Sequence, residues 1–207
     1  MLLRYHPLSS YSRKVALAMD LRGDTIEKVA VDAFAGELKS EGVLSLNPFG
    51  KMPVLETDAG PIYESTSIIE YLEERGPRVL LPLEHERRCR HFDRLGDLYL
   101  LDAIGKFFWN KQEETKKTSF ATLDRAWGVW EQELSDGRDF MCGEVITLAD
   151  VGATIAAHYC ITEEYPLSPA IQAYFSRLCT HPAVAASNEA AAPFVEFTRS
   201  MRYPAIE

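Results

Sequence analysis

A proline at the start of a predicted strand is the first feature of this sequence that could serve a binding site. Pro53 follows Met52 and opens an apolar run that continues to Glu56. A proline in a central strand would remove a hydrogen-bond donor, so it belongs at the strand's beginning. A cis Met52–Pro53 bond would turn the backbone N–H and C=O of Met52 outward toward an extended ligand. The low frequency of cis bonds instead favours an ordinary trans proline.

Hydroxyl groups precede two predicted helices in the same part of the chain. Ser9, Ser10 and Ser12 lie in or at the end of a turn-rich loop before the first helix, where each can cap the helix and where the peptide dipoles stabilise negative charge. Ser65 begins another helix, and the free N–H groups there suit a carboxylate, while Glu64 can pair with an ammonium group. Alternatively, Ser65 only caps its helix and Glu64 is a solvated acid.

Alternating strands and helices must position these residues. Apolar runs and helical periodicity predict the order strand, helix, strand, helix, strand, strand, helix. A right-handed crossover makes the first two strands parallel, and the last two form a hairpin through a turn that ends at Gly60. The strands are expected near residues 2–5, 25–31, 52–56 and 61–63, and the helices end near residues 21, 44 and 76.

The segment Gly76–Pro82 (GPRVLLP) has the composition of a linker. We therefore predict an α/β domain over residues 1–78 and an all-α domain over residues 83–207. Thr147-Leu-Ala-Asp150 has the form of a capping box at the start of one helix of the second domain. The helices of that domain are expected near residues 84–112, 118–134, 148–161, 169–179 and 183–192.

Composition excludes several classes of protein. The chain has 207 residues, of which 46% are hydrophobic and 26% charged, as in globular proteins. Lys and Arg number 22 against 31 Asp and Glu, and the net charge of -9 repels phosphate backbones and anionic lipid. We therefore expect no nucleic acid or membrane partner. With no signal sequence or transmembrane segment apparent, a cytoplasmic location is expected.

Neither the cysteines nor the histidines are spaced as metal ligands, so no metal is expected. The sequence predicts buried thiols for the four cysteines, which are Cys89, Cys142, Cys160 and Cys179.

Four blocks of the sequence resemble the soluble glutathione S-transferase family in the right order: YHPLSSYSRKVALAM, NPFGKMPVL, YESTSIIEYL and VITLADV. The resemblance implies a thioredoxin-like first domain, an all-helical second domain and a twofold homodimer. It also implies a transferase of alkyl or aryl groups, active in detoxification, that conjugates glutathione, its co-substrate, to a small hydrophobic electrophile.

The resemblance assigns glutathione-binding roles to five residues. It implies that Pro53 is cis and that Met52 binds the cysteinyl backbone of glutathione. Glu64 and Ser65 would bind the γ-glutamyl group. Lys51 could meet the glycyl carboxylate, although a solvated lysine explains it equally well.

Ser9 is the predicted catalytic residue. Theta- and delta-like members of the family place a catalytic serine four residues before an arginine of the first helix, and Ser9 lies four before Arg13. Its O–H would donate to the thiolate of glutathione. Ser10 stands where a proline is common, and Ser10, Ser12 and Tyr5 remain alternatives. Because residues 1–88 contain no cysteine, thiol–disulfide exchange is disfavoured.

The electrophile is expected to bind beside the long helix that starts near residue 84. Tyr99, Ala103 and Phe107 recur every four residues and share a face, although such a stripe can equally be core packing. Phe194, Phe197 and Met201 would cover the cleft or dock the tail. Two rival functions remain, a glutathione-dependent isomerase or dehalogenase and a non-catalytic binding or regulatory protein.

Overall fold

The structure is a computed structural model that describes the backbone of residues 1–202 and the side chains of residues 1–198. The chain forms two compact units. Unit 1 contains Met1–Tyr71 and the described residues from Ala185 onward, and unit 2 contains Leu72–Val184. The domain boundary expected between residues 78 and 83 stays a prediction, because packing groups most of the last helix with unit 1.

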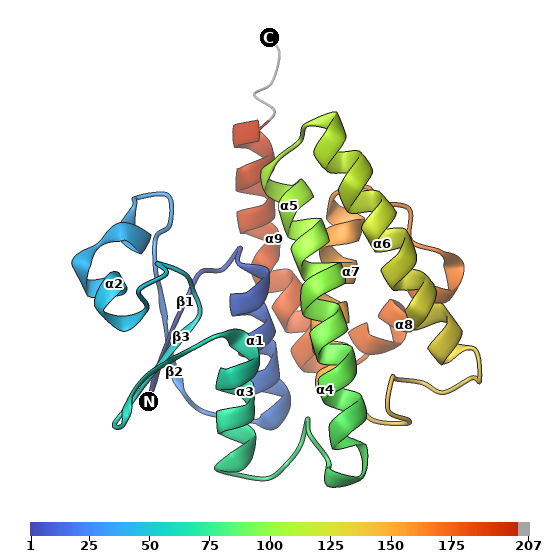
Figure 1. The fold of residues 1–207 in the computed structure, drawn as a ribbon, viewed down its shortest axis with the longest axis horizontal. Coiled ribbons are helices and arrows are strands. Elements are labelled where there is room, and N and C mark those ends of the chain that lie inside the picture. The colour runs from blue at the N-terminus through green and yellow to red at the C-terminus, as the bar shows by residue number, and fades with distance from the viewer. Residues whose placement is uncertain (203–207) are drawn as a thin grey trace. The chain divides into compact units, whose positions relative to one another are not determined.

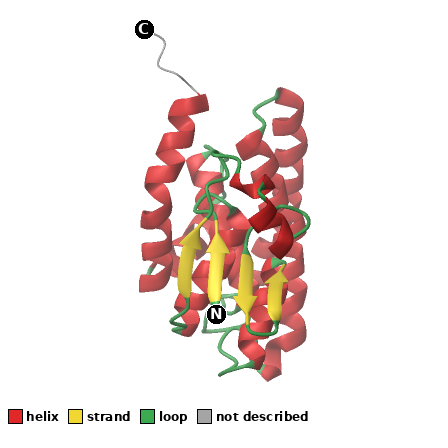
Figure 2. Ribbon diagram, turned by 90° about the vertical axis from the view of Figure 1, so that its left-hand side faces the viewer, coloured by secondary structure: helices red, strands yellow, loops and turns green. Residues whose placement is uncertain are grey.

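Unit 1 is built on a four-stranded mixed sheet, which Figure 2 shows from its face. The strands lie in the order β2-β1-β3-β4, with β1 parallel to β2 and β3 antiparallel to both β1 and β4. The parallel pair and the hairpin confirm the sequence prediction. Leu3, Val54 and Leu55 are fully buried and form part of the core. The bounds are β1 (Leu2–Tyr5), β2 (Glu27–Ala30), β3 (Val54–Thr57) and β4 (Gly60–Tyr63).

The helices α1 (Ser10–Arg22) and α3 (Ser65–Glu74) of the first segment lie where the sequence predicted them. α1 ends at Gly23, whose φ of 75° is the left-handed conformation that glycine adopts without strain. The helix expected over residues 37–44 is instead two short pieces, a 3₁₀ turn at Glu37–Lys39 and α2 (Glu41–Leu46). Ser40 separates them because it is extended and its Oγ caps α2 by accepting from the N–H of Val43 at 3.3 Å.

The last helix, α9 (Pro182–Arg202), is longer than the sequence predicted. The prediction ended it at residue 192, before Pro193, yet Pro193 lies inside the helix. Buried Ala191 and Val195 carry the apolar face across the proline, and this burial outweighs the loss of one backbone hydrogen bond. Phe197 packs edge-on against Phe34, 6.0 Å between ring centres, whereas the side chain of Met201 lies outside the described residues.

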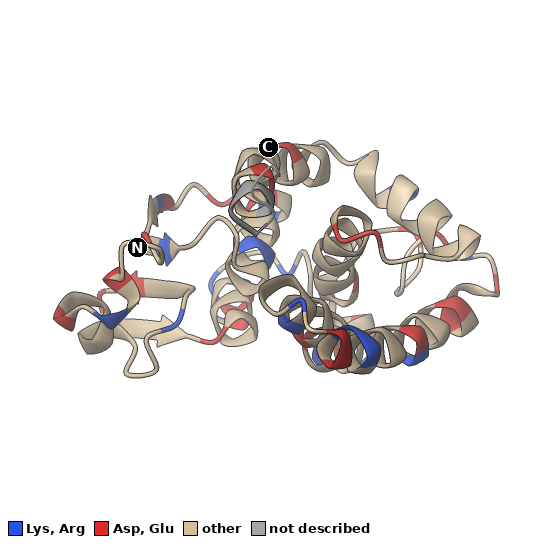
Figure 3. Ribbon diagram, turned by 90° about the horizontal axis from the view of Figure 1, so that it is seen from above, with Lys and Arg blue, Asp and Glu red and all other residues tan. Residues whose placement is uncertain are grey.

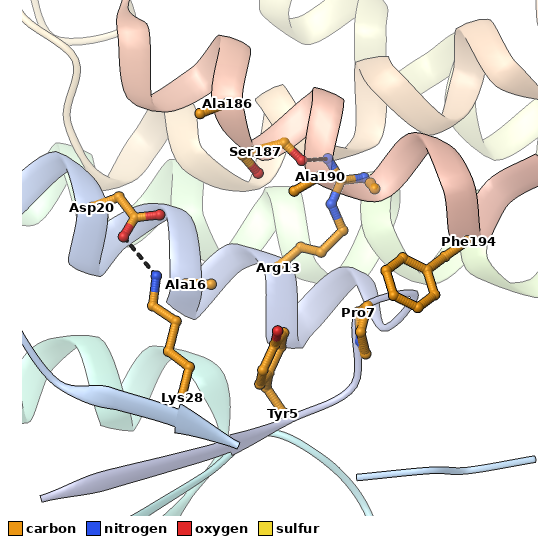
Figure 4. Close-up of a pocket in the computed structure, with 11 residues that line it drawn as sticks. Tyr5, Pro7, Arg13, Ala16, Asp20, Lys28, Ala186, Ser187, Ala190 and Phe194 are labelled. Carbon is orange, nitrogen blue, oxygen red and sulfur yellow. Dashed lines mark hydrogen bonds and ion pairs between the residues drawn. The ribbon is translucent and has the colours of Figure 1, made fainter. Parts of the chain in front are cut away.

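Figure 1 labels α1 and α9, most of which belongs to unit 1. Within that unit Arg13 of α1 binds α9 (Figure 4). It is only 4% exposed, and its Nη2 donates to the carbonyl of Ser187 at 3.3 Å and to Oδ1 of Asn188 at 3.1 Å. The guanidinium thus binds both the backbone and a side chain of α9.

Replacing Arg13 by methionine is expected to lower the free energy of unfolding by about 2 kcal/mol, since the half-buried acceptors Ser187 and Asn188 on α9 lose a charged donor. Urea denaturation followed by circular dichroism measures the change. Arg4→Met is the matched control, because the Arg4–Glu56 ion pair is about one-third exposed and should contribute less than about 1 kcal/mol. Equal effects of the two substitutions would contradict the assignment.

Unit 2 is all-helical, as predicted. One continuous helical run extends from Glu86 to Trp109, but its middle is a π-helical segment at Gly96–Leu101 that the sequence did not predict. Gly96 lies near Gly152, since a Cβ on Gly96 would be 3.9 Å from the Cα of Gly152, an ordinary van der Waals contact. The helices are α4 (Glu86–Leu95), α5 (Asp102–Trp109), α6 (Glu113–Leu134), α7 (Leu148–Thr162) and α8 (Pro169–Cys179), with a 3₁₀ turn at Leu83–His85 and the π segment η3 between α4 and α5.

Asp150 connects three segments of unit 2. Its Oδ2 accepts from the N–H of Thr147 at 2.9 Å and from the Thr147 hydroxyl at 3.0 Å, which completes the predicted capping box. Its Oδ1 accepts from the N–H of Met141 at 2.9 Å and from the Tyr174 hydroxyl at 2.7 Å. Burial raises the pKa of Asp150, and these hydrogen bonds oppose that shift. One carboxylate thus fixes α7, α8 and the loop before α7.

Acidic and basic residues are interspersed along the helices (Figure 3). Two i, i+4 ion pairs, Glu86–Arg90 and Asp102–Lys106, illustrate this mixing. Among the described residues, none of the helices has the length and apolarity that crossing a membrane requires.

Candidate active site

Ser9 lies where the loop after β1 enters α1. It is the N-cap residue, with extended φ and ψ of -74° and 118°, and its Oγ accepts from the N–H of Ser12 at 3.2 Å. The same hydroxyl lies 3.4 Å from the carbonyl oxygen of Met52, to which it donates. Two predicted site residues that are far apart in the sequence are therefore neighbours at a helix N-terminus.

The alternative hydroxyl groups have other environments. Ser12 is fully buried, and its Oγ accepts from the N–H of His6 at 3.2 Å. Ser10 is the first residue of α1 and is half-buried. Tyr5 lines a cavity of about 330 Å³ together with Arg13 and residues of α9 (Figure 4). These positions favour Ser9 as the hydroxyl beside Met52.

His6 shapes the loop that carries Ser9, a role that the sequence analysis missed. Its carbonyl accepts from the N–H of Ser9 at 3.0 Å, and its Nδ1 accepts from the N–H of Leu8 at 3.2 Å. Burial lowers the pKa of His6, although the charge of Asp32 opposes this, so Nδ1 stays available as an acceptor. No spacing in the sequence singles out this histidine.

The peptide bond between Met52 and Pro53 is cis, as the resemblance implied. Met52 is buried and packs in a cluster with Val31 and Val54, which leaves its backbone to face Ser9. The exposed Lys51 precedes it, and its carbonyl accepts from Nδ2 of Asn47 at 2.8 Å.

Asn47 is a second positioning residue that sequence reasoning missed. It is buried, and its Oδ1 accepts from the N–H of Phe49 at 3.0 Å, so its side chain holds both ends of the turn before Lys51. The signal for it was the Asn-Pro pair at 47–48, because such pairs start turns.

Glu64 and Ser65 form the junction between β4 and α3. Glu64 is exposed and has a φ of 74°, an uncommon conformation for a residue with a side chain, and such residues are frequent at functional sites. Ser65 is buried and is the first residue of α3. The ammonium of the buried Lys14 donates to the hydroxyl of Thr66 at 3.1 Å. A positive charge thus lies beside the N-terminus of α3.

The three residues predicted to line the electrophile pocket differ in exposure within unit 2. Tyr99, on the π segment, is 47% exposed, whereas Ala103 and Phe107 on α5 are buried. The Phe107 ring packs edge-on against Phe120 of α6 with ring centres 5.1 Å apart. Core packing therefore accounts for much of the burial of Phe107. Of the three residues, Tyr99 is the one that offers an exposed ring.

Comparison with known proteins places this geometry in a family. Residues 3–79 match the model of the glutathione S-transferase N-terminal domain, and residues 69–182 match the model of the C-terminal domain. The chain belongs to the glutathione S-transferase family. Its thioredoxin-like first part and helical second part are the fold expected of that family.

Individual relatives and a solved structure support this family assignment. Glutathione S-transferase F4 of Arabidopsis thaliana is 27% identical over 161 residues, which are 70% of this chain and 65% of that protein. Maleylacetoacetate isomerase of Pseudomonas aeruginosa is 40% identical over 90 residues, which are 42% of this chain and 42% of that protein. The matched part thus spans less than two thirds of either relative. A delta-class glutathione transferase of Nilaparvata lugens has the same fold, with a TM-score of 0.84, 23% identity and coverage of 97% and 99%.

Among the described residues, no group of three or more His, Cys, Asp or Glu side chains is placed to hold a metal ion.

Proposed function

We propose that this family member conjugates the thiolate of glutathione to a small hydrophobic electrophile, with Ser9 stabilising the thiolate. The observation that carries the proposal is the position of the Ser9 hydroxyl, at the N-terminus of α1 and 3.4 Å from the carbonyl of Met52. A free thiol has a pKa of about 8.5 and is mostly protonated at neutral pH. A hydroxyl donor and helix dipoles at one point can lower that pKa.

Glutathione would bind along unit 1. The backbone of Met52, next to the cis Pro53, would pair with the cysteinyl residue, which places the sulfur beside Ser9. The N–H groups at the start of α3, with Ser65, suit the γ-glutamyl carboxylate, and the exposed carboxylate of Glu64 suits the α-ammonium. Lys51 would meet the glycyl carboxylate.

The chemical step needs no covalent bond to the protein. The Ser9 hydroxyl, which donates to the Met52 carbonyl when glutathione is absent, would turn to donate to the sulfur. The thiolate attacks the electrophilic carbon, the carbon–sulfur bond forms and the leaving group departs. In this proposal Tyr99, whose ring is exposed, would contact the apolar part of the electrophile, and the buried Ala103 and Phe107 would shape the same helical face.

An ultraviolet difference titration of bound glutathione against pH tests this proposal. The pKa of the bound thiol is expected clearly below the free value of about 8.5. Mass analysis of products from a panel of aryl halides and enones is expected to show accumulating glutathione conjugates. Absence of glutathione binding would refute the proposal.

An isomerase is the second candidate, favoured by the 40% identity to maleylacetoacetate isomerase. In that case glutathione attacks and is released again, so the product would form without consumption of glutathione. A reductive dehalogenase would instead oxidise glutathione. Binding with an unshifted thiol pKa and no product would indicate a non-catalytic binding protein.

We also propose a cytoplasmic homodimer, with Phe49 as a contact. Phe49 is 68% exposed, and its ring packs edge-on against Tyr63 at 6.1 Å, so an aromatic surface is available for a partner copy. Phe49→Ser is expected to raise the dissociation constant of the dimer at least about tenfold, as measured by analytical ultracentrifugation. Leu83→Ser, at a position 70% exposed, is the control and should leave the constant unchanged. A dimer unaffected by Phe49→Ser would exclude this contact.

A further inference from the structure

Two of the cysteine side chains of unit 2 are in direct contact. Cys89 on α4 is fully buried, and Cys142, in the loop between α6 and α7, is 5% exposed. Their sulfur atoms lie 3.5 Å apart although no disulfide joins them. Of the other two, Cys160 is fully buried as predicted, but Cys179 is partly exposed, in contrast to the prediction, because it lies in the last turn of α8.

The surroundings make the two sulfur atoms unequal. The hydrogen bond shared with Cys89 lowers the pKa of Cys142, a hydrogen bond to Thr147 and the charge of Arg88 act in the same direction, and burial and the charge of Asp150 oppose them. The shared bond and burial raise the pKa of Cys89. Arg88 is fixed near Cys142 because its Nε donates to the carbonyl of Met141 at 2.7 Å. The nearby Arg88 and the slight exposure of Cys142, compared with the fully buried Cys89, favour Cys142 as the nucleophile of the pair.

We propose that Cys89 and Cys142 form a modification site at which hydrogen peroxide makes an intramolecular disulfide. The Cys142 thiolate attacks one oxygen of peroxide, the O–O bond breaks, and the departing hydroxide takes up a proton as water. This leaves a sulfenic acid on Cys142. The Cys89 sulfur then attacks the Cys142 sulfur, the S–O bond breaks, and the hydroxide leaves with the Cys89 proton as a second water. Two thiols are oxidised and one peroxide is reduced.

The burial of the pair favours a small oxidant, and the short distance between the two sulfur atoms favours a disulfide as the product. A small peroxide can reach a cysteine residue that is 5% exposed, whereas a bulky disulfide reagent is hindered. The sulfurs must approach from 3.5 Å to about 2 Å, a change that side-chain rotation and a small loop movement supply.

The disulfide would join α4 to the loop that contains Met141. This cross-link closes a loop of 53 residues and would restrict the unfolded chain. The oxidised protein is therefore expected to melt about 5 °C above the reduced protein. All these residues belong to unit 2, so the proposal does not depend on glutathione binding.

Peptide mapping of the reduced protein after treatment with hydrogen peroxide tests the proposal. After remaining thiols are alkylated, we expect a linked pair of peptides carrying Cys89 and Cys142, an intact mass lower by two hydrogen atoms, and recovery of both thiols with dithiothreitol. Preferential oxidation of Cys179, with Cys89 and Cys142 still alkylated, would overturn the proposal. This measurement uses the natural chain and needs no buried substitution.

Variants then assign the order of the steps. In Cys89→Ala, the sulfenic acid on Cys142 cannot be resolved and should be trapped by dimedone. In Cys142→Ala, Cys89 should stay reduced. Cys179→Ala is the matched control and should form the same cross-link as the natural chain. Dimedone labelling of Cys89 in Cys142→Ala would contradict the assignment of Cys142 as the nucleophile.

Discussion

Replacing Ser9 by alanine is expected to lower kcat/KM for glutathione conjugation about 100-fold, because the transition state loses a hydrogen-bond donor to sulfur. The bound thiol should return toward its free pKa of about 8.5, since only the dipoles of α1 remain. Stopped-flow kinetics and the ultraviolet titration measure the two effects on the same protein. The affinity for glutathione should change much less than kcat, because the other proposed contacts remain.

Ser9 also caps α1, so two further variants separate chemistry from stability. Loss of the bond to the N–H of Ser12 should cost about 1 kcal/mol of unfolding free energy in Ser9→Ala. Ser9→Thr keeps a hydroxyl for both tasks and should restore much of the rate. Ser10→Ala should leave the thiol pKa unchanged. A larger loss of activity in Ser10→Ala than in Ser9→Ala would move the catalytic role to Ser10.

Replacing Asp150 by alanine is expected to lower the unfolding free energy by about 4 kcal/mol. Asp150 is fully buried and accepts four hydrogen bonds, so its removal leaves buried donors without acceptors. Urea denaturation followed by tryptophan fluorescence measures the loss, since Trp127 and Trp130 are buried in unit 2.

Tyr174→Phe is the matched control for this prediction. It removes only the hydroxyl that donates to Oδ1 of Asp150 and should cost about 1 kcal/mol. Equal losses in the two variants would show that the carboxylate contributes little beyond its contact with Tyr174.

The features that could be predicted from the sequence are those whose structure is determined by residues close to them in the chain. Gly23 ends α1, Thr147 and Asp150 form the capping box, and alternating apolar runs form the strands that bring Ser9 beside Met52. For Gly23 and the capping box, neighbours within a few residues supply the backbone conformation or the hydrogen bonds.

Features that depend on distant neighbours were not predictable. The π segment packs against α7, and α9 continues through Pro193 because its apolar face is buried. His6 acts through its place in a folded loop, which its spacing in the sequence does not reveal. Tertiary packing decided each of these, as it overrides local propensity in many proteins.

The grouping of α9 with the N-terminal sheet has a consequence for protein synthesis. Arg13 leaves the ribosome long before Ser187 and Asn188, its acceptors on α9. Translation of the intervening unit 2 takes on the order of 10 s, and domains usually fold in the order in which they emerge. The nascent α1 must wait during this interval with its α9-binding surface uncovered, so unit 2 can fold before unit 1 is complete.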